Sequence, residues 1–362
     1  MSVIRVPLGA RHYDIHVVES YAPLPAELRR LKLPPSGIVI SHRSLLDRFG
    51  GRLLRPLERA GWQLRTITVP ESERSKSYAS AERLLRLLAP AARMRTPVLF
   101  AFGGGVIGDL AGFVASVFRR GVPYVQLPTT LLAQVDSAIG GKTGVDLPAG
   151  KNLVGAFYQP RLVMSDLGVL AHLPARQRRS GLSEVIKYGV IADPALFRFL
   201  EEHLDACLAG RPRADRLMVE RSSRIKARIV GQDERETKGI RAQLNFGHTL
   251  GHALEAATQY RRFTHGEAIA IGMAYASALS VSLGLMPSRE HERLIRLLKR
   301  AGLPTATSAV SLGAVRRALG HDKKFTDGRM RWVLPTRIGR VAVSDGVPPA
   351  DVWRLARRYV SP

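Results

Sequence analysis

The chain has 362 residues, 45% of them hydrophobic, which is enough for two packed cores, so we expect two domains. Its formal net charge of +25 raises the question of nucleic-acid binding. The excess of positive charge is spread along the chain, because residues 1–175 contain 22 basic and 12 acidic residues and the rest contain 33 basic and 18 acidic residues. There is no basic tail, and no aromatic side chains are spaced to stack on bases. The composition argues against a nucleic-acid-binding protein and favours an electropositive surface that attracts an anionic substrate.

The cysteine content and the hydrophobic segments of the chain indicate the cellular compartment in which the protein is expected to work. Cys207 is the single cysteine, which excludes an intramolecular disulfide framework, and the N-terminal sequence MSVIRVPLGA lacks the apolar run of a signal peptide. We therefore expect a protein of the reducing cytoplasm. The uncharged stretch Ala268–Met286 approaches the length of a membrane span, but it is rich in Ala, Ser and Gly, and so predicts a buried core helix rather than a span.

In the first half of the chain, short apolar runs alternate with amphipathic segments. Four of these runs read as strands: Gly37–Ile40, Gln63–Val69, Pro97–Phe102 and Tyr124–Leu127. Strands that alternate with helices are typical of a parallel sheet covered by helices. Residues 1–174 are therefore predicted to form a Rossmann-like α/β domain.

One of these strands runs into a glycine-rich turn. The sequence GGGVIGD at residues 103–109 follows Pro97–Phe102 and precedes a helical pattern, so Gly103, Gly105 and Gly108 satisfy GxGxxG. Such glycines let backbone N–H groups approach a pyrophosphate at a helix N-terminus. No acidic residue follows about 20 positions later, and the strand is not the first in the chain, so we predict NAD binding through a different α/β arrangement. Close packing of strand on helix is the alternative interpretation of these glycines.

Two further polar segments are expected at the same edge of the sheet. Glu73 and Lys76 follow one predicted strand, and Thr129 and Thr130 follow another. Ligands of open α/β sheets gather outside the carboxyl ends of the strands. Threonine also suits the N-cap of a helix, so both interpretations stay open for Thr129 and Thr130.

After about residue 175 the pattern changes to long helical periods. They cover Pro194–Leu208, Arg216–Gln232, Gly266–Leu285 and His291–Ala301. Residues 175–362 are therefore predicted to form a second, mostly helical domain, with the boundary at the turn Leu173-Pro174.

Residues with the spacing of metal ligands lie in this second domain. In RAQLNFGHTLGHALE, Arg241, Asn245, His248 and His252 follow one another at spacings of 4, 3 and 4, which on a single helix would line one face. Spacing alone favours His248 and His252 as a pair of ligands.

Further candidates flank this segment. Glu184 and Lys187 lie three residues apart on one predicted helical face, and His265 follows a short loop. Two imidazoles and one carboxylate leave a position open on Zn²⁺, as catalytic zinc requires. His321 is another candidate, although the acidic and basic residues that follow it suggest contact with an anion.

Lysine is rare in the chain but concentrated in motifs. There are 10 lysines against 45 arginines, and seven of them lie in motifs rich in glycine, histidine or acidic residues: Lys76, Lys142, Lys151, Lys187, Lys226, Lys323 and Lys324. An ammonium group is a compact point charge and guanidinium is a planar fork, so the two do not substitute for each other at a phosphate or carboxylate site. These lysines indicate an anion site.

Taken in chain order, six segments closely resemble the 3-dehydroquinate synthase family: GGGVIGDLAGFVAS, RGVPYVQLPTTLLAQVDSAIGGKTGVD, GKNLVGAFYQP, SGLSEVIKYG, LNFGHTLGHALE and HGEAIAIGMA. The resemblance extends from about Glu73 to Lys324. It implies conversion of 3-deoxy-D-arabino-heptulosonate 7-phosphate to 3-dehydroquinate and phosphate, the second step of the shikimate route to aromatic amino acids. It also implies NAD⁺, a divalent metal that is usually Zn²⁺ with Co²⁺ as a substitute, and a homodimer.

The resemblance assigns roles to individual residues of this chain. The implied metal ligands are Glu184, His248 and His265, which leaves His252 to contact substrate. The implied NAD contacts are Glu73, Lys76, Gly104, Gly105, Asp109, Thr129, Thr130, Asp136, Lys142 and Lys151. The implied substrate contacts are Arg120, Asp136, Lys142, Asn152, Lys187, Lys226, Arg241, Asn245, His252, Lys323 and Lys324. Within these sets Lys142, Lys187, Arg241, Asn245 and His252 are the implied catalytic residues, and Arg120 is implied to reach the phosphate from the neighbouring subunit.

The chain departs from the family pattern at three places. The stretch from Glu234 to Arg241 has one residue more than the usual spacing. Ser41-His42 stand where many members carry an acidic or amide contact to the cofactor ribose, and His172 replaces a common threonine.

Two other enzyme classes are compatible with parts of the sequence. The nearest alternative is a sister sugar phosphate cyclase such as amino-dehydroquinate synthase. A metal-dependent polyol dehydrogenase of related plan suits the sequence less, because a simple polyol needs no lysine-rich anion site.

Overall fold

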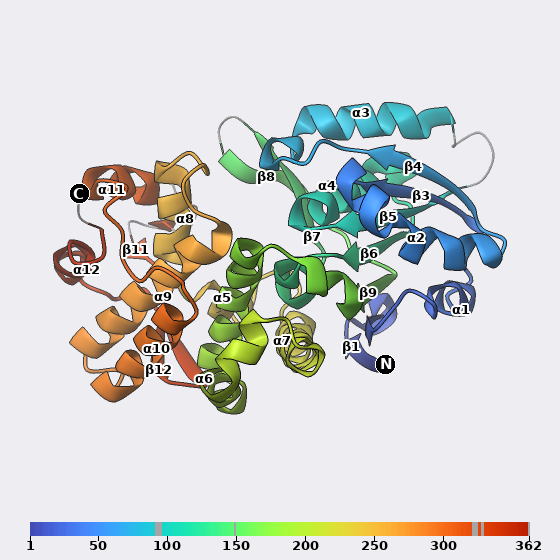
Figure 1. Cartoon of the computed structure of the whole chain (residues 1–362). Coiled ribbons are helices and arrows are strands. Elements are labelled where there is room, and N and C mark those ends of the chain that lie inside the picture. Colours follow the sequence, from blue (N-terminus) through green and yellow to red (C-terminus); the bar gives the residue numbers. More distant parts are fainter. Residues whose placement is uncertain (91–95, 148–149, 321–324, 327–328, 361–362) are drawn as a thin grey trace. The chain divides into compact units, whose positions relative to one another are not determined.

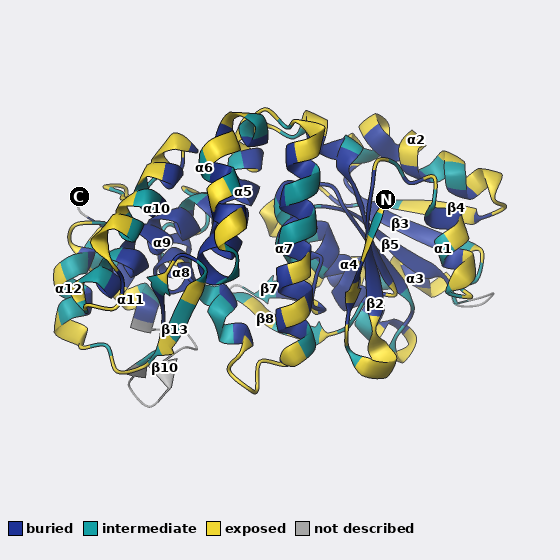
Figure 2. Cartoon of the chain, turned by 90° about the horizontal axis from the view of Figure 1, so that it is seen from below, coloured by how far each residue is buried: buried dark blue, intermediate teal, exposed yellow. Residues whose placement is uncertain are grey.

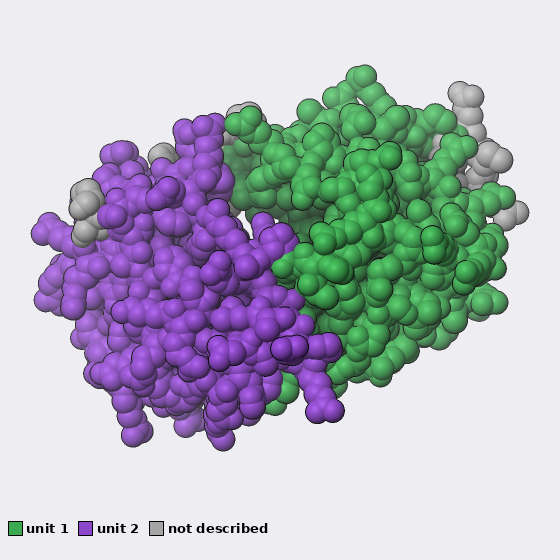
Figure 3. Space-filling model, viewed as in Figure 1, with its two compact units in different colours: residues 1–173, 215–235 green, residues 174–214, 236–362 purple. Residues whose placement is uncertain are grey.

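The computed structural model describes residues 1–90, 96–147, 150–320, 325–326 and 329–360. It divides into two compact units, which Figure 3 colours separately. Unit 1 comprises Met1–Leu173 and Asp215–Arg235, and unit 2 comprises Pro174–Ala214 and Glu236–Pro362.

The division differs from the single boundary predicted near residue 174, because Asp215–Arg235 groups with unit 1. The reason is long-range packing of this helical segment. Within unit 1, Ser223 donates to the carbonyl oxygen of Gln134 at 3.4 Å, and Lys226 donates to that of Asp136 at 2.8 Å. The order of elements along the chain does not reveal such contacts.

Unit 1 is built on a seven-stranded sheet with the order β1-β2-β9-β6-β5-β3-β4 (Figure 1). Neighbouring strands are parallel except for β1 and β2, which pair antiparallel. The strands are β1 (Ser2–Val6), β2 (Tyr13–Val18), β3 (Ser36–Ser41), β4 (Gln63–Thr68), β5 (Val98–Gly103), β6 (Tyr124–Pro128) and β9 (Leu162–Asp166). The four predicted strands are confirmed as β3, β4, β5 and β6.

Helices cover both faces of this sheet, which is why its central strands read as continuous apolar runs. All six residues of β5 are buried: Leu99 and Ala101 pack in one core cluster with α3 and α4, and Phe100 and Phe102 pack in another with α1 and α2. Figure 2 shows the central strands in the colour of buried residues. The helices of this unit are α1 (Leu24–Arg30), α2 (Arg43–Arg59), α3 (Tyr78–Leu88), α4 (Gly105–Val117) and, from Asp215 onward, α7 (Pro212–Gln232).

A separate antiparallel hairpin, β7 (Lys142–Leu147) and β8 (Gly150–Phe157), packs against α4. It carries Lys142, Lys151 and Asn152, so the packing of one hairpin positions three of the predicted site residues.

Unit 2 is mostly helical, as predicted. Its helices are α5 (Ala175–Ala192), α6 (Pro194–Leu208), α8 (His248–Ala257), α9 (His265–Ser282), α10 (Ser288–Arg300), α11 (Leu312–Gly320) and α12 (Pro349–Ala356). Two small hairpins complete it: β10 (Phe325–Thr326) with β11 (Arg329–Met330), and β12 (Trp332–Arg337) with β13 (Arg340–Ser344).

Helix α9 is the buried core helix predicted from the uncharged stretch. It contacts α5, α8, α10, α12 and β12. Its start is fixed by a capping box in which Thr264 and Glu267 each accept from the other's backbone N–H. In the part of the chain that the structure describes, no helix combines the length and apolarity needed to cross a membrane.

Residues 241–255 do not lie on a single helix, so the shared face that their spacing describes is not formed. Arg241–Asn245 form a 3₁₀ turn, and α8 begins only at His248. Gly247 between them has φ of 79°, in the left-handed region that favours glycine. A Cβ there would lie 2.6 Å from Met273 Cγ and 2.8 Å from the Ile269 carbonyl oxygen, both on α9. The close approach of α9 therefore coincides with a reorientation of the backbone before the first histidine.

Candidate active site

The glycine-rich turn lies between a strand and a helix, as predicted. β5 ends at Gly103, Gly104 precedes the first turn of α4, and that turn contains no acidic side chain. A Cβ on Gly108 would lie 2.9 Å from Gln126 Oε1, so Gly108 serves helix–strand packing. Gly104 and Gly105, at the N-terminus of α4, are the positions suited to an anion.

The two threonines that follow β6 have different environments. Thr130 Oγ1 accepts from the backbone N–H of Ala133 at 3.1 Å, so Thr130 caps a turn. The backbone N–H of Thr129 donates to the Gly103 carbonyl oxygen at 3.0 Å, which places Thr129 beside the glycine-rich turn. Its hydroxyl is buried and has no hydrogen-bond partner among the described residues. A buried hydroxyl of this kind, next to a helix N-terminus, fits a polar group of a bound dinucleotide.

Lys76 is the centre of a charged network in unit 1. Its ammonium donates to Asp109 Oδ2 on α4 at 2.5 Å and to Asn152 Oδ1 on β8 at 2.6 Å. Burial alone lowers the pKa of Lys76, but Asp109 outweighs it and the pKa is raised, so the ammonium stays charged. Burial raises the pKa of Asp109 despite the nearby cation. The structure thus joins two predicted cofactor residues to a predicted substrate residue.

Two more lysines of unit 1 are held by carboxylates. Lys151 Nζ lies 2.6 Å from Glu73 Oε1, and Lys226 Nζ lies 2.9 Å from Asp136 Oδ1. Asp136 belongs to a single π-helical turn, Ala133–Ser137, a conformation frequent at functional sites. These pairs restrict the positions of both ammonium groups.

Lys142 and Arg120 occupy exposed positions in unit 1. Lys142 is the first residue of β7. Arg120 ends a turn in which Arg119, Arg120 and Gly121 have φ of 51°, 63° and 120°. Two successive non-glycine residues with positive φ are strained backbone, which is more common at functional positions than elsewhere.

In unit 2, one carboxylate and two imidazoles converge from three helices. Glu184 lies on α5, His248 begins α8 and His265 begins α9. Glu184 Oε1 lies 3.4 Å from His265 Nε2 and 3.7 Å from His248 Nε2. Ligand atoms bound tetrahedrally to one Zn²⁺ lie roughly 3.3–3.6 Å apart, so this spacing fits a single ion.

The environment of Glu184 also fits a metal ligand. The side chain is fully buried, and its Oε1 faces the Nε2 atoms of both imidazoles. Lys187, one turn later on α5, forms an ion pair with Oε2, which confirms the predicted shared face. Burying a carboxylate is costly unless its charge is compensated, and a cation at Oε1 would complete that compensation.

The remaining predicted residues of this unit lie around these helices. Arg241 is buried with its Nε 3.5 Å from Glu236 Oε1, and Asn245 belongs to the same 3₁₀ turn, which packs against α5. The His252 ring is 5.1 Å from that of His248. Lys323, Lys324 and His321 lie outside the described residues.

Comparison with known proteins decides the family. The model for the N-terminal part of 3-dehydroquinate synthase matches residues 66–180, and the model for its C-terminal part matches residues 181–325. A 3-dehydroquinate synthase from Picosynechococcus sp. is 45% identical over 347 residues, which are 95% of this chain and 95% of that protein. The chain belongs to the 3-dehydroquinate synthase family.

Solved structures of other cyclases share the fold of this family member. A 2-epi-5-epi-valiolone synthase from Streptomyces hygroscopicus with NAD⁺ and Zn²⁺ bound is 28% identical, with a TM-score of 0.87 and coverage of 96% of this chain and 97% of that one. A 2-deoxy-scyllo-inosose synthase complexed with carbaglucose-6-phosphate, NAD⁺ and Co²⁺ is 25% identical, with a TM-score of 0.87 and coverage of 99% and 100%.

One buried acid of this 3-dehydroquinate synthase family member was not selected from the sequence. Glu255 Oε1 lies 3.4 Å from His265 Nδ1, and His252, Glu255 and His265 form a second group whose atoms could hold an ion. Its spacing in the sequence could have identified it, because Glu255 follows His252 by three residues on α8 and so lies on the same helical face.

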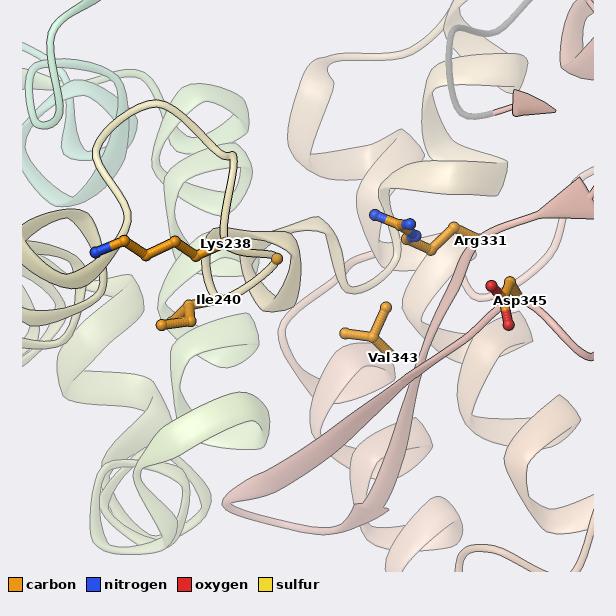
Figure 4. Close-up of a pocket in the computed structure, with 6 residues that line it drawn as sticks. Lys238, Ile240, Arg331, Val343 and Asp345 are labelled. Carbon is orange, nitrogen blue, oxygen red and sulfur yellow. The ribbon is translucent and has the colours of Figure 1, made fainter. Parts of the chain in front are cut away.

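The stretch before Arg241, which is one residue longer than the usual family spacing, contributes to a cavity in unit 2. This cavity, of about 380 Å³, is lined by Lys238, Gly239, Ile240, Arg331, Val343 and Asp345 (Figure 4). Figure 4 shows the ammonium of Lys238 pointing away from Arg331 and Asp345. The charged groups of Lys238 and Arg331 therefore do not converge on a common point where an anion could bind. We assign this cavity no role in the reaction.

The affinity of the site for a divalent metal is expected to rise with pH. Burial alone lowers the pKa of His265, but Glu255 and Glu184 outweigh it and raise the pKa to about 10 in the metal-free protein. A metal must displace this proton, so below pH 10 each pH unit is expected to raise the association constant about tenfold. Calorimetric titration with Zn²⁺ from pH 6.5 to 8.5, in buffers of different ionisation enthalpy, measures the proton released. Binding without proton release at pH 7 would contradict the expectation.

Proposed function

We propose that the chain converts 3-deoxy-D-arabino-heptulosonate 7-phosphate to 3-dehydroquinate and phosphate in the cytoplasm. The observation that carries the proposal is the 45% identity to a 3-dehydroquinate synthase over 95% of both chains. In the reaction, the ring alcohol is oxidised to a ketone, which acidifies the adjacent C–H bond. Loss of that proton and of phosphate is followed by return of the hydride, and the opened enol closes by an intramolecular aldol step, so there is no net oxidation.

Unit 1 is proposed to bind the dinucleotide. Bound NAD⁺ would supply the hydride acceptor and later the hydride donor. Gly104 and Gly105 would give its phosphates access to the N-terminus of α4, and the Thr129 hydroxyl would gain the hydrogen-bond partner that it lacks among the described residues. The other proposed contacts are Glu73, Lys76, Asp109, Thr130, Asp136, Lys142 and Lys151.

Unit 2 is proposed to hold Zn²⁺, with Co²⁺ as a substitute, through Glu184, His248 and His265. The ion would act as a Lewis acid that polarises the alcohol and carbonyl oxygens of the substrate. Lys187 pairs with Oε2 of Glu184, so Oε1 would be the oxygen available to hold the ion. His252, whose ring adjoins that of His248, is proposed to contact substrate and to move a proton.

The anionic groups of the substrate require fixed cations. Lys226 and Lys187 are suited to this because each is already oriented by a carboxylate, so little conformational freedom is lost on binding. The other proposed substrate residues are Arg120, Asp136, Lys142, Asn152, Arg241, Asn245, Lys323 and Lys324. Orientation of phosphate and carboxylate by such groups lowers the barrier by several kcal/mol in well-organised sites.

We further propose a homodimer in which Arg120 acts on the substrate of the neighbouring subunit. The support is its exposed position in a strained turn, which holds the side chain outside the packed core of its own unit.

The test is phosphate release from 3-deoxy-D-arabino-heptulosonate 7-phosphate by chelator-treated protein, with the carbocyclic product identified by mass spectrometry. Dehydroquinate is expected only when both NAD⁺ and Zn²⁺ are added back. The nitrogen-containing analogue and the substrates of the valiolone and inosose cyclases serve as comparison substrates. Turnover of one of those alone, by folded protein that binds both cofactors, would replace the proposal with a sister cyclase.

A further inference from the structure

Glu255 is a buried acid that the proposed chemistry does not use. It lies on α8 with 6% of its surface exposed. Its Oε1 lies 3.4 Å from Nδ1 of His265, whereas Nε2 of the same ring lies 3.4 Å from Glu184 Oε1. The imidazole of His265 therefore stands between two carboxylates, with one ring nitrogen directed at each.

The second imidazole of the site has a parallel arrangement. His248 Nδ1 lies 3.1 Å from the carbonyl oxygen of Phe246, and its Nε2 lies 3.7 Å from Glu184 Oε1. Both rings thus present Nε2 to Glu184 and Nδ1 to an acceptor. A neutral imidazole carries one proton, and an acceptor at Nδ1 keeps the proton there and leaves the Nε2 lone pair for a metal.

Glu255 could instead be a ligand itself, together with His252 and His265. The state of Glu184 argues against this. Its carboxylate is fully buried and only Oε2 is paired with Lys187, so an ion placed away from Glu184 would leave Oε1 and the two Nε2 atoms that face it without a shared cation. An ion at Glu184 Oε1 would use Nε2 of both rings and keep Glu255 as the acceptor at Nδ1 of His265.

We propose that Glu255 is a positioning residue, whose carboxylate accepts the Nδ1 proton of His265 and directs Nε2 at an ion shared with Glu184 and His248. The inference rests on the proposed metal-dependent function. It makes the two histidines unequal, because a carboxylate raises the basicity of His265 as a ligand more than a carbonyl raises that of His248.

The test compares Glu255→Gln with Glu267→Gln. Glutamine at 255 keeps the size of the side chain and removes the charge. Glu267, two residues after His265, accepts from the Thr264 backbone and pairs with Arg176, and glutamine retains the capping interaction. The control therefore removes the same charge close to the same histidine without touching its ring.

Zn²⁺ affinity is measured by competition with a chromophoric chelator, and ligand geometry by the visible absorption of the Co²⁺ protein. Glu255→Gln is expected to weaken Zn²⁺ binding about 10- to 100-fold and to shift the Co²⁺ bands. Glu267→Gln is expected to leave both unchanged within about threefold, and circular dichroism of the metal-free variants checks that both fold.

Two results would overturn the assignment. Unchanged affinity and spectrum in Glu255→Gln would show that the carboxylate does not act on the ring. A loss as large as that in Glu184→Gln would make Glu255 a ligand rather than a positioning residue.

If Glu255→Gln does not fold, the unmodified Co²⁺ protein tests the ring orientation that the proposal requires. Its proton NMR spectrum is expected to contain two exchangeable, paramagnetically shifted N–H signals, one from Nδ1 of each ligand histidine, and a single such signal would refute the arrangement. These measurements do not depend on turnover. A protein that binds metal as expected but forms no dehydroquinate would contradict the proposed function and leave Glu255 as the positioning residue.

Discussion

Glu184→Gln is expected to abolish measurable turnover and to lower the affinity for Zn²⁺ by two to three orders of magnitude. Apparent binding free energies of structural zinc sites are about 10–16 kcal/mol over four ligands, so one ligand accounts for about 2.5–4 kcal/mol, or on the order of 10²- to 10³-fold. Glu184 is the only anion in the proposed set and is fully buried, so water does not readily take its place. Metal content after gel filtration and phosphate release measure the two effects.

Stability separates the metal effect from misfolding. The side chains of Glu184 and Lys187 are 0% and 1% exposed, so removing one charge of the pair is expected to cost about 3–5 kcal/mol in the metal-free protein. Glu184→Gln/Lys187→Met removes both charges and is expected to recover most of that loss while still not binding metal. A Glu184→Gln protein with normal Zn²⁺ affinity would refute this ligand set and favour His252, Glu255 and His265.

Lys76→Met is expected to lower the stability of unit 1 by about 3 kcal/mol and to weaken NAD⁺ binding. The ammonium joins Asp109 on α4 to Asn152 on β8, and its loss leaves a largely buried carboxylate without its cation. For a unit of this size the change corresponds to a fall in Tm on the order of 10 °C. Thermal unfolding and calorimetric titration with NAD⁺ measure the two effects.

For stability, Lys151→Met is the matched control, because its partner Glu73 is 49% exposed and such a pair contributes no more than about 1 kcal/mol. Lys151 is itself a proposed NAD⁺ contact, so this control applies to thermal unfolding and not to NAD⁺ titration. Lys76→Met/Asp109→Asn is expected to regain stability but not NAD⁺ affinity. Equal Tm values for the Lys76 and Lys151 variants would show that the buried network does not stabilise the unit.

Local elements were predictable because their signals are short-range. The buried strand β5 reads as a continuous apolar run, and the predicted range Pro194–Leu208 coincides with α6. The glycine-rich turn also lies in the expected place between a strand and a helix. Its sequence did not show which glycines serve phosphate binding and which serve the packing of helix on strand. Only the contact of Gly108 with Gln126 showed that this glycine serves packing.

Helical spacing failed where a residue of special conformation interrupts it. A series of 4, 3 and 4 describes one face of a helix only if the helix is continuous, and Gly247 in the left-handed region ends that continuity. Likewise, the helical segment Asp215–Arg235 groups with unit 1 because of partners about 90 residues away in sequence, as for Ser223 with Gln134.

The sequence by itself determined the chemical types in the site: a carboxylate, a series of histidines and a set of lysines that arginine does not replace. It also determined the two kinds of domain, because alternation of strands and helices and long helical periods are local patterns. Only the tertiary structure decided which ring nitrogens face Glu184, that Glu255 stands behind His265, and that Lys76 joins a helix to a hairpin. The physical reason is that these arrangements depend on the packing of α5, α8 and α9, and of α4 and β8, between residues far apart in the sequence, for which spacing along the chain carries no information.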